Sequence, residues 1–211
     1  MSKATTTRGR IDKRQAILDV AFTVFARRGY ERTCVQEIAD EAGVAKPTVY
    51  NHLQDKETLF RSTVEAAADE IGTQCLHAIE PLRGGDDPGP VLLTVARELL
   101  GICAGARAHA LRSLAYAESS SFPDVVLTVQ ERTSIRLAEA LSDRFARLGL
   151  SGRLRAEDPE RAAEQFLALL TGPLEARSRL GTREVGAAEL DAIADAATDT
   201  FLRAYRAGEK Q

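Results

Sequence analysis

The chain has 211 residues, of which 44% are hydrophobic and none is tryptophan. This is enough for one core with a small module attached, and we expect that arrangement. No stretch approaches the roughly 18 uninterrupted apolar residues of a membrane helix, and the N-terminus MSKATTTRGR lacks the apolar region of a secretion signal; we therefore expect a cytoplasmic protein without a membrane partner. The three cysteines lie far apart and form no Cys-x-x-Cys pair, which argues against a disulfide framework and a structural zinc site.

The net charge of −3 conceals an uneven distribution. Residues 1–56 carry 10 Lys and Arg against 7 Asp and Glu, whereas residues 57–211 carry 18 against 24. A basic end on an acidic body indicates a polyanionic partner for that end only, and we expect a flexible basic arm over residues 1–11. From charge alone, a solvated disordered tail fits as well.

The first predicted elements are helices. Apolar residues recur every three or four positions from Lys13 to Arg28, and Gly29 is expected to end this helix. Thr33 and Gln36 have the spacing of a capping box, which predicts the start of a second helix that ends at Gly43.

A short third helix is expected from near Lys46, with a proline in its first turn, where a missing N–H costs little. Its inward side is Val44, Val49 and Leu53, and its other side chains are polar or flat. Asp55 is expected to cap a long fourth helix that runs to about residue 79. The second and third helices, joined by a glycine-containing turn of about three residues, have the layout of a helix-turn-helix.

Residues 17–60, ILDVAFTVFARRGYERTCVQEIADEAGVAKPTVYNHLQDKETLF, resemble the DNA-binding domain of the tetracycline-repressor (TetR/AcrR) family of bacterial transcription regulators. The resemblance rests on a combination of motifs: Ala-x-x-x-Phe in the first helix, Gly-Tyr, the Thr before the second helix, Ile-Ala, Ala-Gly-Val, Thr-Val-Tyr, His and Asp-Lys-Glu. Ala45 stands where the family usually has serine or a similar cap, and Leu53 where it has phenylalanine.

The resemblance implies an all-α fold with a DNA-binding domain over residues 12–56 and an effector-binding and dimerisation domain over residues 57–211. The implied partners are a double-stranded DNA operator, a second copy of the chain and a small-molecule effector. No cofactor is expected, and no metal is expected because the histidines form no His-x-x-x-His or Glu-x-x-His pair. By position, it implies phosphate contacts from Thr33, Tyr50, His52 and Lys56, and base-edge or groove contacts from Lys46, Pro47, Thr48 and Asn51.

Further helices are expected at about 90–106, 108–119, 124–148, 158–179 and 187–206, with Pro and Gly between them. Within this half, LRSLAYAESSSFPDV (111–125) and DPERAAEQFLALLTGPLEARSRLG (158–181) are similar to the C-terminal type of AefR-like members.

The last two predicted helices carry apolar stripes. By family resemblance these stripes form a four-helix bundle between two subunits, whereas periodicity alone allows them to face the core of one subunit. The predicted dimer-interface residues are Phe166, Leu169, Leu170, Leu174, Leu190, Ile193, Ala197 and Phe201. A dimer would place two reading helices on the half-sites of a palindromic operator.

We expect the chain to be a repressor. A small, largely apolar effector would bind the C-terminal helices, shift the fourth helix and so release the protein from DNA. Glu118, on the apolar side of its predicted helix, is a candidate ligand contact together with His109 and Tyr116; an internal salt bridge or a helix-end position for Glu118 is the alternative. Cys34 is expected to pack, with a redox role as the alternative.

The sequence also bears on two other classes of protein, enzymes and protein-interaction modules. The chain lacks a Gly-x-Ser-x-Gly motif, a P-loop and a dinucleotide fingerprint, so we do not expect an enzyme. A helix-turn-helix used only as a protein-interaction module is the alternative to an operator-binding regulator, and the salt dependence of DNA binding would separate the two.

Overall fold

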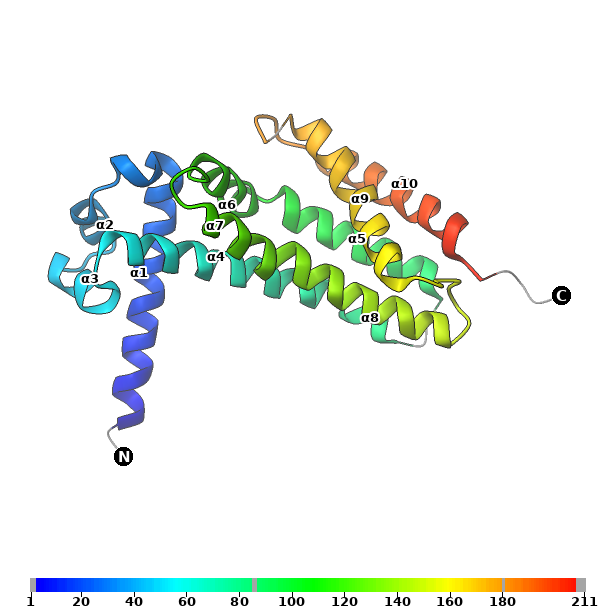
Figure 1. Ribbon diagram of the computed structural model, residues 1–211, viewed down its shortest axis with the longest axis horizontal. Coiled ribbons are helices and arrows are strands. Elements are labelled where there is room, and N and C mark those ends of the chain that lie inside the picture. Colours follow the sequence, from blue (N-terminus) through cyan, green and yellow to red (C-terminus); the bar gives the residue numbers. More distant parts are fainter. Residues whose placement is uncertain (1–2, 85–86, 180, 208–211) are drawn as a thin grey trace. The chain divides into compact units, whose positions relative to one another are not determined.

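The computed structural model describes residues 3–84, 87–179 and 181–207. These residues form helices joined by short connections, with one isolated bridge between Leu154 and Arg206 and no sheet among them, which confirms the all-α prediction (Figure 1). The chain forms two compact units, Met1–Glu70 with Ala110–Arg132, and Ile71–His109 with Thr133–Gln211. The first unit therefore extends beyond the helix-turn-helix domain expected over residues 12–56.

The first helix, α1 (Lys3–Arg32), is interrupted at Gly29, whose φ of 74° is left-handed. Glycine adopts this conformation without a Cβ clash, so the helix breaks where the sequence predicted. Residues 3–11 are helical, whereas we expected a flexible arm there; Met1 and Ser2 lie outside the described residues. The inward face of α1 is fully buried and consists of Ile17, Leu18, Ala21, Phe22, Val24 and Phe25.

The helix-turn-helix pair is α2 (Val35–Glu41) and α3 (Lys46–Leu53), joined by a turn in which Gly43 has a φ of 65°. The predicted capping box is wrong. Cys34, not Thr33, is the N-cap, and it caps no amide with its side chain. The Thr33 hydroxyl instead donates a hydrogen bond to the Gly29 carbonyl, at the break in α1, at 2.7 Å.

The fourth helix, α4 (Lys56–Ala78), contributes to both compact units. Asp55 Oδ1 accepts a hydrogen bond from the Thr58 amide at 2.7 Å, which confirms the predicted cap. A 3-10 turn at Glu80–Arg83 follows α4.

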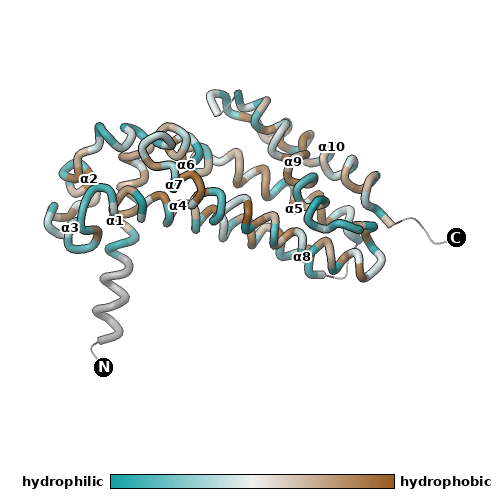
Figure 2. The backbone as a smooth tube through the Cα atoms, viewed as in Figure 1, coloured by the Kyte–Doolittle hydropathy of each residue, from teal (hydrophilic) through white to brown (hydrophobic). Residues whose placement is uncertain are grey.

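The second unit is built mainly from α5 (Pro88–Ala104), α8 (Arg136–Leu150), α9 (Pro159–Ser178) and α10 (Ala187–Tyr205), with α9 packed on α8, α5 and α10. Its core contains a chain of aromatic rings: Phe145, Phe166 and Phe201 lie with ring centroids 5.1 to 5.9 Å apart, and Tyr205 stacks on Phe201 at 4.7 Å. Figure 2 shows apolar and polar residues alternating along these helices, as expected for helices with one buried side.

This core corrects the predicted dimer interface. Six of the eight residues predicted there are buried inside a single chain: Phe166, Leu170, Leu174, Ile193, Ala197 and Phe201. The stripes pack against α5 and α8 of their own subunit, and periodicity could not distinguish that partner from a second copy. Leu169 and Leu190 are half-buried.

Two further helices, α6 (Ala106–Ala117) and α7 (Pro123–Gln130), fall largely in the first unit. The single helix expected at 124–148 contains a π-helical turn at Glu131–Ile135, which separates α7 from α8. Among the described residues no single helix is long and apolar enough to cross a membrane; α5 and α6 meet that criterion only as a pair, and the pair is bent by 56°.

Candidate nucleic-acid interface and ligand pocket

The reading helix α3 is anchored by two side chains one turn apart. Val49 and Leu53 are 1% and 2% exposed, and they hold α3 against the rest of the first unit. Because side chains four positions apart share a face of a helix, the residues between these anchors must point elsewhere. The sequence therefore fixes which side of α3 is available to a partner.

The structure brings seven of the eight predicted DNA-contact residues onto α3 and the start of α4. Pro47, Tyr50 and Asn51 are exposed, and Lys46, Thr48, His52 and Lys56 are partly exposed. The eighth, Thr33, is 3% exposed, and its hydroxyl donates to Gly29, so the structure assigns it to the fold rather than to the surface.

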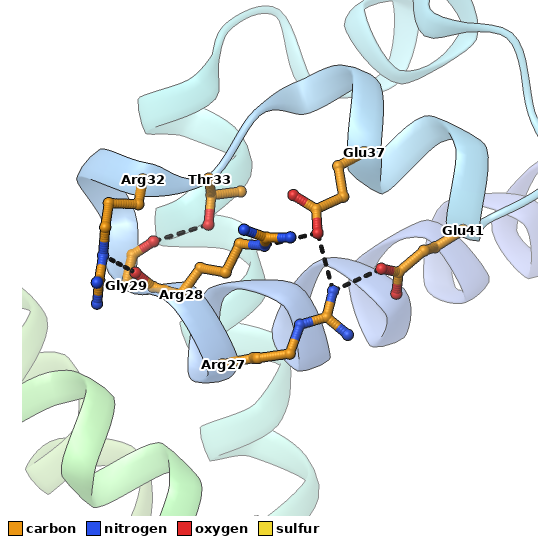
Figure 3. Close-up of polar contacts among 7 residues, drawn as sticks. All are labelled: Arg27, Arg28, Gly29, Arg32, Thr33, Glu37 and Glu41. Atoms are coloured by element: carbon orange, nitrogen blue, oxygen red, sulfur yellow. Dashed lines mark hydrogen bonds and ion pairs between the residues drawn. The ribbon is translucent and has the colours of Figure 1, made fainter.

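The electrostatics of this surface suit a polyanion. From Ala42 to Gln54 the sequence contains no Asp or Glu. Two of the three acidic residues of α2 are paired with α1: Arg27 pairs with Glu37 at 2.9 Å and with Glu41 at 2.6 Å, and Arg28 pairs with Glu37 at 2.7 Å (Figure 3). The third, Asp40, accepts a hydrogen bond from Gln36 at 2.7 Å. Hydrogen bonds to Glu41 and then Glu37 raise the pKa of Arg27. These pairs also fasten α2 to α1.

Lys56 is held in place at the edge of this surface. Its Nζ donates to the Glu31 carbonyl at 3.1 Å and lies 4.5 Å from the centroid of the Tyr30 ring, a cation–π contact. On α3, Lys46 lies 5.9 Å from the Tyr50 ring centroid, a looser contact of the same kind. Two basic groups are thus oriented by aromatic rings at the two ends of α3.

A pocket of about 840 Å³ lies within the second unit. It is lined by α4, α5 and the first turn of α6, with apolar side chains such as Ile71 and Ile102 beside the polar Gln74, His77 and Glu98. Its size lies within the range of small-molecule sites, about 300–1,000 Å³. The pocket combines residues about 30 positions apart, a grouping that helical periodicity does not reveal.

None of the three residues predicted to contact a ligand lines this pocket. Tyr116 is 66% exposed. Glu118 accepts a hydrogen bond from the Tyr30 amide, which agrees with the helix-end alternative for this carboxylate. His109 lies against Gly181 in the second unit.

Cys34 is exposed, so the expectation that it packs is wrong. Cys75 is buried and forms a hydrogen bond with Cys103. A hydrogen bond to Cys103 and then burial raise the pKa of the Cys75 thiol far above its ordinary value. Cys75 is therefore a thiol, not a thiolate, at neutral pH. Among the described residues, no three His, Cys, Asp or Glu side chains gather as metal ligands would.

Comparison with protein families agrees with this geometry. The profile described as the C-terminal domain of AefR-like transcriptional repressors matches residues 90–207, more than half of the chain, and the profile of bacterial regulatory proteins of the tetR family matches residues 17–63. The chain belongs to the TetR family. Both resemblances noted in the sequence are confirmed.

Three similar proteins illustrate this membership. The HTH-type transcriptional repressor KstR2 of Rhodococcus jostii is 35% identical over 68 residues, or 32% of this chain and 33% of that protein. A TetR-family regulator from Mesorhizobium loti has a TM-score of 0.86 at 28% identity, covering 93% of this chain and 98% of that one. The flavonoid-responsive regulator FrrA has a TM-score of 0.73 at 25% identity, covering 92% and 97%.

The match to KstR2 spans about a third of that repressor's length. The structural matches cover nearly the whole chain. These proteins and the family profiles are those of transcription regulators, which confirms that this TetR-family chain is a DNA-binding regulator and not an enzyme.

Proposed function

We propose that this TetR-family chain is a homodimeric repressor that binds a palindromic operator through α3 and leaves it when a small, largely apolar molecule fills the pocket. The observation that carries the proposal is the acid-free surface of α3, anchored by Val49 and Leu53 and flanked by Lys46 and Lys56. Such a surface suits double-stranded DNA, which offers phosphates to the basic groups and base edges to the polar side chains.

The contact roles follow from placement. Four residues of α3 are suited to contact base edges and the groove. They lie in its first turn or on its exposed side: Lys46, Pro47, Thr48 and Asn51. Tyr50, His52 and Lys56 are suited to phosphates. Thr33 is omitted from the contact set because its buried hydroxyl is engaged with Gly29.

The dimer would use the outer faces of α9 and α10 rather than their apolar stripes. These faces carry exposed small residues at a spacing of four: Ala168, Gly172 and Ala176 on α9, and Ala188, Ala192 and Ala196 on α10. Small side chains allow the axes of packed helices to approach closely. The half-buried Leu169 and Leu190 border these faces and would be covered in the dimer.

The pocket is where the effector would act. A ligand shifts a DNA-binding equilibrium only by its difference in affinity for two arrangements of the protein. The α4 helix contributes Ile71, Gln74 and His77 to the pocket wall and begins at Lys56 on the DNA-facing surface. FrrA responds to flavonoids, and a flavonoid is therefore a reasonable first probe.

The test is a selection of bound sequences from a pool of random DNA duplexes by the purified protein. The proposal predicts an enriched inverted repeat with half-sites about one helical turn apart. No enrichment, with the protein folded, would instead favour the interaction-module alternative, to which the comparisons lend no support. Adding a flavonoid to the selected complex then tests release.

A further inference from the structure

A carboxylate from outside the helix-turn-helix holds the last turn of α1, which follows the break at Gly29. Glu118 comes directly after α6, and its Oε1 accepts a hydrogen bond from the Tyr30 amide at 2.7 Å, across 88 positions of sequence. Tyr30 follows Gly29, where the helix breaks, so its amide needs a partner other than the regular helical carbonyl. Glu118 supplies that partner.

The fit between the two segments is close. A Cβ at Gly29 would lie 3.0 Å from Glu118 Oε1, so the carboxylate rests directly against glycine backbone. Both the left-handed φ of Gly29 and the close approach of Glu118 favour a residue without a Cβ at this position. The contact is therefore a close-packed hydrogen bond within the first unit and not a loose surface pair.

Aromatic and ionic contacts at the start of α7 reinforce it. Phe122, whose amide donates to the Glu118 carbonyl at 2.8 Å, packs edge-on against Tyr30 with ring centroids 4.7 Å apart. Its ring is also 5.0 Å from that of Phe60 on α4. Asp124 pairs with Arg61, and the Arg61 guanidinium lies over the Phe122 ring.

The turn held by Glu118 also contains the two residues that contact the Lys56 ammonium group, Tyr30 and Glu31. The Lys56 ammonium group lies over the Tyr30 ring and donates to the carbonyl of Glu31, the next residue. A change in the position of residues 30 and 31 therefore moves both groups that orient Lys56.

We propose that Glu118 is a positioning residue for DNA binding: it fixes the Tyr30–Glu31 turn and, through it, the Lys56 ammonium that meets a DNA phosphate. This inference rests on the proposed operator binding. It gives an acidic side chain a favourable effect on binding to a polyanion, which is opposite to the general effect of its charge.

The test compares Glu118→Ala, Glu118→Gln and Glu184→Ala with the wild type. The Gln side chain retains an oxygen that accepts from Tyr30, and Glu184, exposed in the second unit, provides the same loss of charge elsewhere. DNA affinity is measured by fluorescence anisotropy on the selected operator over a salt series, at a temperature where each variant is folded by circular dichroism.

The proposal predicts that Glu118→Ala weakens binding about tenfold and lowers the salt slope by about 0.9, the value of one phosphate contact. Glu118→Gln should remain close to the wild type, and Glu184→Ala should bind equally well or more tightly. In a Lys56→Ala background, Glu118→Ala should cause little further loss, because both changes remove the same contact.

Unchanged or tighter binding by folded Glu118→Ala would overturn the proposal, as would a full, additive loss in the Lys56→Ala background. If Glu118→Ala does not fold, Glu118→Asp, which keeps the charge but shortens the reach, should show the same loss and the same non-additivity. If the wild type binds no DNA, the proposed function itself is refuted. If the wild type binds DNA and the Glu118 variants bind with the same affinity, only the role of Glu118 is refuted.

Discussion

Lys56 Nζ lies 4.5 Å from the centroid of the Tyr30 ring and donates a hydrogen bond to the carbonyl of Glu31. The ammonium group is thus oriented before any DNA arrives. A pre-oriented charge loses less side-chain freedom on binding than a free lysine does. Among the residues proposed to contact phosphates, Lys56 is therefore the one whose position the structure defines best.

Replacing Lys56 with alanine should weaken binding to every DNA sequence by the same factor. Phosphates carry no sequence information, so the loss should be equal on operator and scrambled duplexes, with a salt slope smaller by about 0.9. Anisotropy on both duplexes checks this. A loss confined to the operator would show that Lys56 reads bases instead.

Thr48→Ala should change sequence preference rather than general affinity. Thr48 lies one residue before the buried anchor Val49, in the first turn of α3, where a side chain can reach base edges. Loss of such a contact costs about 1–3 kcal/mol of discrimination at one base pair. The measurement is affinity for operators with single base-pair changes. Equal losses at all positions and on random DNA would contradict this role.

The outer face of α10 should control assembly. Ala192→Glu places a carboxylate on the small-residue face, and two-fold symmetry would place it in the interface twice. We expect a monomer by sedimentation equilibrium and much weaker operator binding. Ala26→Glu, which adds the same charge to an exposed position of α1, is the control and should stay dimeric. A dimeric Ala192→Glu would exclude this face as the interface.

The cap of α4 should make stability depend on acid pH. The Thr58 amide lowers the pKa of Asp55 below its ordinary value of 3.8. Because the folded value is the lower one, the stabilisation is complete above 3.8 and is lost as the pH falls through the folded value. Asp55→Ala should therefore lower Tm at pH 7, and the difference from the wild type should shrink in acid.

Asp55→Asn is the matched variant for this cap, because its side-chain oxygen still accepts from the Thr58 amide without a charge. We expect its Tm at pH 7 to lie between those of the wild type and Asp55→Ala. A pH-independent gap between the wild type and Asp55→Ala would show that the charge of Asp55 contributes nothing.

The helix-turn-helix could be predicted from sequence because its determinants are local. Gly29, Gly43 and Asp55 each act within a few residues, and Val49 with Leu53 defines the inner side of α3 by spacing alone. The capping box failed because the Thr33 hydroxyl has a competing acceptor, the Gly29 carbonyl. That competition arises only once the helix break exists in space.

Features that join distant segments could not be predicted. The stripe residues Phe166 and Phe201 have the same periodicity whether they face α5 and α8 or a second subunit. The pocket pairs the end of α4 with α5, and Glu118 meets Tyr30 across 88 positions. Such pairings depend on tertiary packing, which a single sequence read for periodicity does not specify.

Operator binding is best tested by fluorescence anisotropy of the purified protein on DNA from upstream of its own gene, compared with scrambled DNA of equal length, over a salt series. An operator-binding repressor should bind the upstream DNA tightly and the scrambled DNA more weakly, and both affinities should fall steeply with salt. Absence of binding to either DNA at low salt, by a protein that is folded and dimeric, would contradict operator binding.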